Sequence, residues 1–407
     1  MKIVVTNGVI SNTGDAAIFA GIHHSLVEEG VATSADITLL DSNAHRTAKL
    51  YPQWNVVQQI GVAPPRRWMK ISRAISRIRR IFVERLAAGS PLATLILRLP
   101  IARRTHAGRA YEALRRADLV ISTGGTYLVD HYDFAHRAAE LELAKRLGKR
   151  VVLWTQSVGP FSTPRAASSI HRIIACVDAA YFRDDRSRDA WIGQGGAPDT
   201  SFTVPDVVFA LEPPQTDSLA REDRVLLSVR EWPHRGANGE SYDVSRYEAT
   251  MRHAATKSAA TDHRPVAVST CQGVPGYVDD SRYARRIFEG IGVRVDGEFH
   301  TPEQLVHELQ RSSAAVSTRM HLAILSLISR VPAIAIAYEF KTWELFKSLG
   351  LERFVATIED VTPEWIEKAL DDLHADPASA CLGASRLAAV REAARLPARH
   401  LLHSKHD

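Results

Sequence analysis

Short apolar runs alternate along the chain with longer stretches in which apolar residues recur every three or four positions. Runs rich in Val and Ile are typical of strands in a parallel sheet, and the longer stretches are typical of the helices that connect such strands. The first set predicts strands over 2–6, 37–40, 119–122, 151–155 and 179–182, and helices over 16–29, 136–147, 166–176 and 187–192.

A second set begins near residue 225, after a stretch rich in proline and acidic residues. It predicts strands over 225–229, 266–270, 314–317 and 333–337, and helices over 246–257, 282–289, 302–311 and 321–328. The predicted fold class is therefore α/β, with two Rossmann-like domains that face a cleft. We expect an N-terminal domain over 1–214, a C-terminal domain over 215–376, and a last helical segment over 377–407 that could pack back on the first domain.

The composition is that of an ordinary globular protein: 45% of the 407 residues are hydrophobic and 24% are charged. These proportions exclude collagen-like, disordered and multi-pass membrane classes. The three cysteines lie far apart, which argues against a disulfide framework or a structural zinc site and favours a reducing compartment. The first residues lack the apolar length of a signal peptide, so we expect a cytoplasmic protein.

The net charge of +5 originates in one segment. Residues 66–116 contain fourteen Arg or Lys and two Glu, so this segment carries +12 and the rest of the chain −7. We expect a basic helical insert over about 55–116, in which apolar residues of 66–85 recur at helical spacing: Trp68, Ile71, Ile75, Ile78 and Phe82. One interpretation is a helix packed on the first domain with a solvated cationic face, and the other is a helix that binds an anionic membrane surface. No nucleic-acid-binding fold accompanies the charge, so nucleic acid is not an expected partner.

Ligands of open α/β sheets bind beyond the carboxyl ends of the strands, so the loop after each predicted strand is a candidate site. After the first strand, Asn12, Gly14 and Asp15 form a turn that opens a helix and leaves backbone N–H groups available for an anion. Asp15 is either the N-cap of this helix or a substrate-binding residue. The glycine fingerprint of dinucleotide-binding proteins is absent.

Three further loops of the first domain carry candidate residues. Gly124 and Gly125 follow a predicted strand and would allow close approach of a ligand or of neighbouring backbone. Gln156 and Ser157 form a polar pair after the next strand, before a Gly-Pro turn. Arg183 directly follows the strand over 179–182, where it either faces the cleft or pairs with a local carboxylate.

In the second domain, Arg230 and Arg319 each follow a strand, and His321 stands where the next helix begins. The arginine fork suits a carboxylate or phosphate, and histidine can exchange a proton near neutral pH. Lys341 adds a further cation after the strand over 333–337. Together these residues predict an anion site with acid–base capability. The histidines are scattered without ligand spacing, so no metal is expected.

These motifs, taken in order, resemble the polysaccharide pyruvyl transferase family. The resemblance extends from residue 12 to about 341 and rests on Asn12-x-Gly14-Asp15-x-Ala17-Ile18, Asp118 with Gly124-Gly125, Gln156-Ser157-x-Gly159-Pro160, Arg183-Asp184 with Ser187, Pro205-Asp206-x-x-Phe209, Ser317-x-Arg319-x-His321 and Tyr338-x-x-Lys341. Within this range, the Arg-rich stretch from about 55 to 112 matches the family poorly.

The resemblance implies a two-domain fold of the glycosyltransferase-B type and transfer of the enolpyruvyl group of phosphoenolpyruvate to sugar hydroxyls of a polysaccharide or its lipid-linked precursor, which forms a pyruvate ketal. Arg319, with Arg183 or Arg230, would then hold the donor anion. His321 would bind the donor or transfer a proton, and Asp15 is the candidate base for the acceptor hydroxyl. Phosphoenolpyruvate is the donor substrate, and no cofactor or metal is implied.

Two alternatives remain open. One is a glycosyltransferase of the same architecture, in which Arg319 and Lys341 would hold the diphosphate of a nucleotide sugar. The other is a non-catalytic relative that binds a glycan or an anion without turnover.

Overall fold

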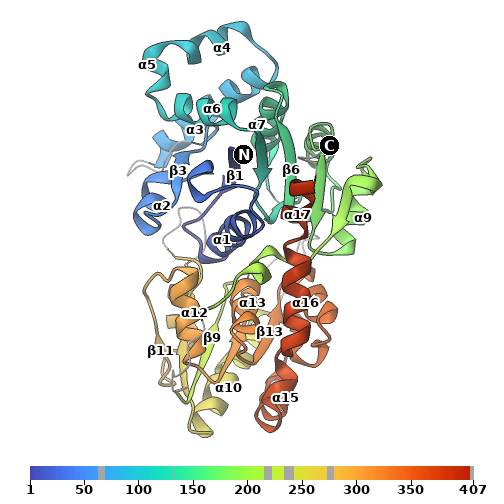
Figure 1. The fold of residues 1–407 in the computed structure, drawn as a ribbon. Coiled ribbons are helices and arrows are strands. Elements are labelled where there is room, and N and C mark those ends of the chain that lie inside the picture. The colour runs from blue at the N-terminus through green and yellow to red at the C-terminus, as the bar shows by residue number, and fades with distance from the viewer. Residues whose placement is uncertain (63–68, 131, 215–221, 233–242, 273–278, 404–407) are drawn as a thin grey trace. The chain divides into compact units, whose positions relative to one another are not determined.

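The computed structural model describes residues 1–407 apart from 63–68, 131, 215–221, 233–242, 273–278 and 404–407. The chain divides into two compact units. The first comprises Met1–Ser11, Ile18–Ala210 and Glu392–Asp407, and the second comprises Asn12–Ala17 and Leu211–Arg391. Each unit is built on its own sheet (Figure 1).

The first unit contains a parallel sheet with the strand order β3-β2-β1-β4-β6-β7-β8, and β5 pairs with β6. Its strands are β1 (Ile3–Gly8), β2 (Ile37–Asp41), β3 (Asn55–Gln58), β4 (Leu119–Ser122), β5 (Gly125–Leu128), β6 (Arg150–Val158), β7 (Ala179–Phe182) and β8 (Ser201–Thr203). Its helices are α1 (Thr13–Glu28), whose first residues belong to the second unit, α2 (Ala44–Leu50), α3 (Met69–Ala87), α4 (Pro91–Arg98), α5 (Pro100–Arg103), α6 (His106–Arg116), α7 (Ala135–Arg146), α8 (Pro164–Ile174), α9 (Asp185–Gly193) and α17 (Leu396–His403).

The second unit contains a parallel sheet with the order β11-β10-β9-β12-β13-β14. Its strands are β9 (Arg224–Ser228), β10 (Arg264–Ala267), β11 (Arg294–Val295), β12 (Ala314–Ser317), β13 (Ala333–Ala337) and β14 (Val355–Thr357). Its helices are α10 (Val244–Ala260), α11 (Asp280–Ile287), α12 (Pro302–Gln310), α13 (Met320–Ile328), α14 (Phe340–Ser348), α15 (Pro363–Ala375) and α16 (Ala384–Ala394).

In both sheets the first strand of the unit lies in the interior. The next strands along the chain are added on one side of it, and the later strands are added on the other side. The reversal creates a switch point between β1 and β4 in the first unit, and between β9 and β12 in the second. This is the strand order of a Rossmann-like domain, so the predicted fold class is confirmed for each unit.

Strands made of continuous apolar runs coincide with their predicted bounds: β4, β7, β12 and β13. The predicted strand over 151–155 is longer, because β6 continues through Gln156 and Ser157 to Val158. Several short strands were not predicted (β3, β5, β8, β11 and β14) because they lie at or near sheet edges and contain polar residues or glycine instead of an apolar run.

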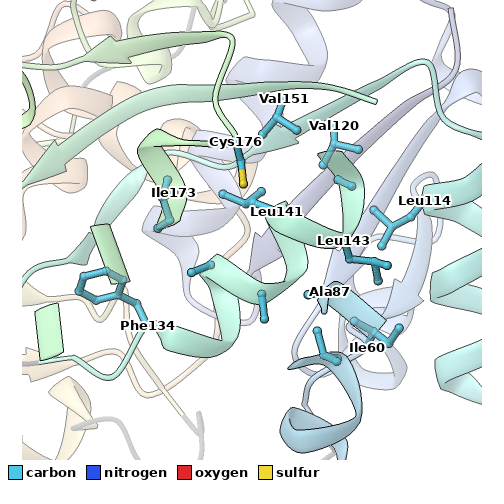
Figure 2. Packing of buried hydrophobic residues seen from close by; sticks show 14 of the residues in the cluster. Ile60, Ala87, Leu114, Val120, Phe134, Leu141, Leu143, Val151, Ile173 and Cys176 are labelled. Atoms are coloured by element: carbon cyan, nitrogen blue, oxygen red, sulfur yellow. The ribbon is translucent and has the colours of Figure 1, made fainter. Parts of the chain in front are cut away.

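A hydrophobic core holds the first sheet and its helices together. Figure 2 shows Val120 of β4 and Val151 of β6 in the same cluster as Leu141 of α7 and Ile173 of α8. Phe134, just before α7, is also fully buried in this cluster. The rigid packing fixes where the strands end, and therefore where the loop residues are placed.

The range of the predicted basic insert, about 55–116, contains β3 and four helices, α3 to α6, of which α3 corresponds to the amphipathic helix expected over 66–85. Residues 63–68, which include Trp68, lie outside the described residues. The burial pattern of α3 also differs from the prediction: Val83 and Leu86 are buried, whereas Ile78 is 66% exposed. The predicted apolar stripe was wrong at Ile78, because the residues in contact with the core lie about one position further round the helix.

The last helical segment forms two helices, α16 and α17, after a short 3₁₀ turn at Pro377–Ala380. From Glu392 onward the chain belongs to the first unit. There His400 Nδ1 lies 3.0 Å from the Tyr181 hydroxyl of β7, and Arg399 pairs with Glu29 at 3.2 Å.

Candidate functional site

The switch point of the second unit brings two of the predicted arginines to neighbouring strand ends. β9 ends at Ser228 and is followed by Arg230, and β12 ends at Ser317 and is followed by Arg319. The two strands pair directly, with Ser317 opposite Ser228. In doubly wound sheets this crevice is where ligands bind.

Arg319 forms a bidentate ion pair with Asp280, the first residue of α11. Its Nε donates to Asp280 Oδ2 at 2.9 Å and its Nη2 to Oδ1 at 2.5 Å. The Asp280 side chain is 1% exposed and that of Arg319 15%. Burial lowers the pKa of Arg319, but Asp280 more than reverses this, so the pKa is raised and the guanidinium stays charged. The Ser317 hydroxyl fixes the turn by accepting from the Arg319 N–H at 3.1 Å.

Arg230 is held differently. Its guanidinium stacks on the Tyr338 ring, 3.9 Å from the centroid, and its backbone N–H donates to the Tyr247 hydroxyl at 3.2 Å. That hydroxyl lies 2.8 Å from Thr318 Oγ1, and burial raises the pKa of Tyr247 to about 12, so it remains a neutral hydrogen-bonding group. Within the described residues no carboxylate pairs with Arg230, and its buried Nε makes no hydrogen bond there. Its charge is therefore available to an anionic ligand.

Lys341 lies in the first turn of α14, after β13. Its Nζ pairs with Glu339 at 2.7 Å and lies 5.6 Å from the centroid of the Tyr338 ring. The aromatic ring of Tyr338 is thus in contact with two cations, Arg230 and Lys341.

The turn that opens α1 belongs to the second unit and contacts His321. Asn12 Oδ1 accepts from the Gly14 N–H at 2.9 Å, so Asn12 caps the helix and Asp15 is its third residue. The N-cap alternative for Asp15 was therefore wrong. A Cβ on Gly14 would lie 2.5 Å from His321 Nδ1, so only glycine fits against the imidazole. Thr13 anchors the turn, because its N–H donates to Thr270 O at 3.0 Å.

The electrostatics of Cys271 show that these groups form one cluster. Burial raises the pKa of this thiol to about 11; Arg319 and Arg230 act against the rise, and Asp280 and Asp15 add to it. The thiol is therefore neutral, and the charges of both arginines and both carboxylates reach it. Within the described residues, no three side chains are arranged as a metal site.

The candidate residues of the first unit form a buried hydrogen-bond network. Gln156 and Ser157 are in β6 and are fully buried, instead of lying in a loop. Gln156 Nε2 donates to the Tyr127 hydroxyl at 2.7 Å and to the Thr123 carbonyl. Ser157 Oγ donates to Asp184 Oδ2 at 3.1 Å, and Asp184 caps α9. These two side chains hold neighbouring strand ends in place.

Arg183 pairs with a local carboxylate, as one of its two interpretations predicted. Its Nη1 lies 2.6 Å from Asp206 Oδ2, its Nε donates to Ser157 Oγ at 3.1 Å, and its Nη2 donates to Thr126 Oγ1 at 2.9 Å. The side chains of the pair are 5% and 1% exposed. Arg183 therefore has a structural role in this arrangement. Little of its surface is left to contact a ligand.

At Gly124 the structure bears out one of the two predicted alternatives, close approach of neighbouring backbone. A Cβ on Gly124 would lie 2.7 Å from Thr155 Oγ1 and 2.9 Å from the Trp154 carbonyl, so Gly124 allows β4 to pack against β6. Gly125 starts β5 with a φ of +138°, which favours glycine.

Sequence reasoning missed the carboxyl group at the centre of the first unit. Glu140 of α7 is 1% exposed; its Oε2 accepts from Thr6 Oγ1 at 2.9 Å and from Gln59 Nε2 at 2.8 Å. Burial raises its pKa, against the effect of these hydrogen bonds. Asn7, beside it near the end of β1, has a φ of +68°, a left-handed conformation that asparagine adopts more readily than most non-glycine residues. A glutamate within the apolar helix pattern of 136–147 was the available signal.

Asp280 and Tyr247 of the second unit were also missed. Asp280 lies in an acidic helix start, Asp279-Asp280-Ser281, which is typical of an N-cap, and Asp279 does cap this helix. The pairing of Asp280 with Arg319, 39 residues away, depends on the fold alone.

Comparisons with known proteins agree on family and fold. A family model described as polysaccharide pyruvyl transferase matches residues 12–339. The amylovoran biosynthesis protein AmsJ of Erwinia amylovora is 24% identical over 387 residues, which is 89% of each chain.

Among solved structures, the UDP-GlcNAc 2-epimerase of Neisseria meningitidis has a TM-score of 0.58 at 9% identity and covers 99% of this chain and 100% of its own. The putative UDP-N-acetylglucosamine 2-epimerase of Listeria monocytogenes has a TM-score of 0.57 at 12% identity, with 95% of this chain and 93% of its own covered. These likenesses show the fold, two Rossmann-like domains of the glycosyltransferase-B type, as predicted.

Proposed function

The chain belongs to the polysaccharide pyruvyl transferase family, and on that premise we propose that it transfers the enolpyruvyl group of phosphoenolpyruvate to sugar hydroxyls and forms a pyruvate ketal. The observation that carries the proposal is Arg230, a stacked guanidinium at a switch point with no carboxylate partner within the described residues. A small donor with a carboxylate and a phosphate requires a site of this kind.

Donor binding combines charge with backbone N–H groups. Arg230 would hold one anionic group of phosphoenolpyruvate through its guanidinium edge, because Tyr338 covers one of its faces. Arg319, oriented by Asp280, contributes a second and largely neutralised cation. The start of α13 lies directly after Arg319 and adds its positive helix end to the attraction.

The reaction requires three proton transfers. The methylene carbon of the enolpyruvyl group gains a proton while a sugar hydroxyl attacks C2 and loses its own proton. The bond between C2 and the phosphate oxygen then breaks, and a second hydroxyl closes the ketal and gives its proton to the departing phosphate. We propose His321 for donor binding or for proton transfer, and Asp15 as the base that takes the proton of the acceptor hydroxyl.

The central experiment measures phosphate release from phosphoenolpyruvate with a panel of lipid-linked and nitrophenyl glycosides. We expect release only when an acceptor is present, and we expect Arg230→Gln to raise the KM for phosphoenolpyruvate about tenfold or more, with partial recovery in Arg230→Lys. Arg294→Gln, an exposed arginine at β11, is the matched control and should change neither constant.

Two results would refute the proposal. Release of a nucleoside diphosphate from a nucleotide sugar, without any response to phosphoenolpyruvate, would identify the alternative glycosyltransferase. Binding of a glycan or anion without turnover across the acceptor panel would identify a non-catalytic relative.

The predicted acceptor, a polysaccharide or its lipid-linked precursor, remains part of this proposal, and so does a location at the inner face of the cell membrane. None of the described helices combines the length and the apolar character that crossing a membrane requires.

A further inference from the structure

The exposed apolar side chains of the described residues are concentrated in one part of the first unit. Eight large hydrophobic residues are exposed in the described part of the chain. Seven of them lie between Ile78 and Ile101, and the eighth is Tyr132. We call the seven the apolar surface: Ile78, Ile81, Leu92, Leu95, Ile96, Leu99 and Ile101. Such concentration is unusual for a protein surface that only meets water.

Helix α4 is apolar on two sides. Ala93 and Leu97 are buried in the core of the first unit. Leu92, Leu95, Ile96 and Leu99 recur at spacings of three, one and three residues, which places them on another face, and they are between 41% and 67% exposed. An ordinary surface helix would carry polar residues on that face, so packing within the chain does not account for the sequence of α4.

The neighbouring helices extend the surface. Ile78 and Ile81 are on the exposed side of α3, and Ile101, at 78% exposed, is in α5. Helix α4 packs against α3, α5 and α6. Figure 1 shows α4 and α5 at the margin of the first unit, beyond α3 and α6 from the sheet.

Arginines accompany the apolar surface, and acids do not. Five exposed arginines lie on or beside these helices: Arg77 and Arg85 in α3, Arg103 in α5, Arg104 directly after it, and Arg109 in α6. Glu84 is the single acidic residue of the sequence from 69 to 111, and it is paired with Arg172 at 2.7 Å. The surface is therefore both apolar and strongly cationic.

We propose that α4 and α5, with the outer side of α3, dock on the surface of an anionic lipid bilayer. The leucines and isoleucines would enter the boundary between headgroups and acyl chains, and the arginines would contact lipid phosphates. Long arginine side chains can cover apolar surface and still reach a phosphate, which suits them to this position. This surface differs from the helix over 66–85 predicted from the sequence, because α4 and α5 supply most of the apolar residues.

Charge complementarity favours lipid over a second copy of this chain. A second copy of this chain would bring the same arginines against each other, which costs free energy at a cationic interface. A bilayer with anionic headgroups instead supplies a negative surface of any extent, and it accepts apolar side chains of any shape.

The test uses the full chain and does not depend on the enzymatic activity. Co-sedimentation with vesicles of phosphatidylcholine, with or without phosphatidylglycerol, measures partitioning at low and high salt. We expect binding to the anionic vesicles only, with a strong reduction at high salt. Leu95→Gln/Ile96→Gln and Arg103→Gln/Arg104→Gln should each lower the partition coefficient about tenfold or more.

Matched controls separate this surface from general effects. Tyr132→Gln removes the exposed hydrophobic residue outside the apolar surface, and Arg294→Gln/Lys347→Gln removes two exposed cations of the second unit; both should bind like the unaltered protein. Equal loss in a control and in its matched variant would overturn the proposal. So would absence of binding at low salt, or a dimer in sedimentation velocity that Leu95→Gln/Ile96→Gln converts to a monomer, since the occupant would then be a second copy.

Discussion

The two units have the same strand order but fill their switch points with different chemistry. In the first unit, side chains such as Asn7, Ser122 and Tyr127 bond to one another around the buried carboxyl group of Glu140. In the second, Arg230 and Arg319 follow the adjacent strand ends. The shared backbone therefore does not determine the ligand. The proposed anionic donor suits the cationic switch point of the second unit.

The largest expected effect concerns the proton transfers in the cationic unit. If His321 moves a proton, His321→Ala should lower kcat by about 10²–10⁴, because that is the usual contribution of general acid–base catalysis. Phosphate release from phosphoenolpyruvate measures it. Asp15→Asn, compared under the same conditions, shows which of the two residues carries the larger share. Undiminished turnover in His321→Ala would remove this role.

The next effect concerns the buried ion pair. Asp280→Ala leaves the Arg319 charge buried without its partner, so the free energy of unfolding should fall by about 3–5 kcal/mol. Asp279 directly precedes Asp280 and is the N-cap of α11. Asp279→Ala removes only this cap and should lower the free energy of unfolding by about 1 kcal/mol. Denaturant unfolding of both variants checks the difference. Equal losses would mean that the pair contributes no more than a cap.

A smaller effect is expected from Gly14→Ala. The new methyl group would displace the His321 imidazole. Misplacement of a catalytic group by about 1 Å can lower turnover about 10²-fold, so we expect a loss of this order. Gly193→Ala, at the end of α9 where a Cβ meets no atom within 4 Å, should leave turnover unchanged. Steady-state rates for the two variants test whether the α1 turn positions His321.

The smallest effect concerns Glu140 in the neutral unit. Since burial raises its pKa, the folded protein holds this proton more tightly than the unfolded chain, and stability falls as the pH rises above the ordinary range of a glutamate. Glu140→Gln should therefore gain stability relative to the unaltered protein as the pH rises from mildly acidic to neutral. Glu112, whose pKa is lowered to about 2 mainly by Arg115, is the opposite control: Glu112→Gln should be less stable than the unaltered protein at neutral pH, and this difference should disappear as the pH falls toward 2. Thermal unfolding as a function of pH gives both signs.

The sequence predicts those parts of the molecule in which the local pattern and the fold agree. The continuous apolar runs of β4 and β12 were predicted with their bounds, because such runs can be buried only as central strands. It placed Arg230, Arg319 and His321 at strand ends for the same reason. It did not predict Asp280 as the partner of Arg319 or Glu140 as a buried carboxyl, because both depend on contacts between distant segments. Gln156 and Ser157 were assigned to a loop because β6 continues through polar residues.

The ion pair between Arg319 and Asp280 also constrains how this protein can evolve. Loss of either residue alone leaves a buried unpaired charge, so the intermediate with one substitution is less stable than either the paired or the doubly substituted protein. Descendants of a common ancestor should therefore retain both residues or replace both. A lineage that has kept the arginine at this strand end and lost the aspartate should carry a new acid nearby.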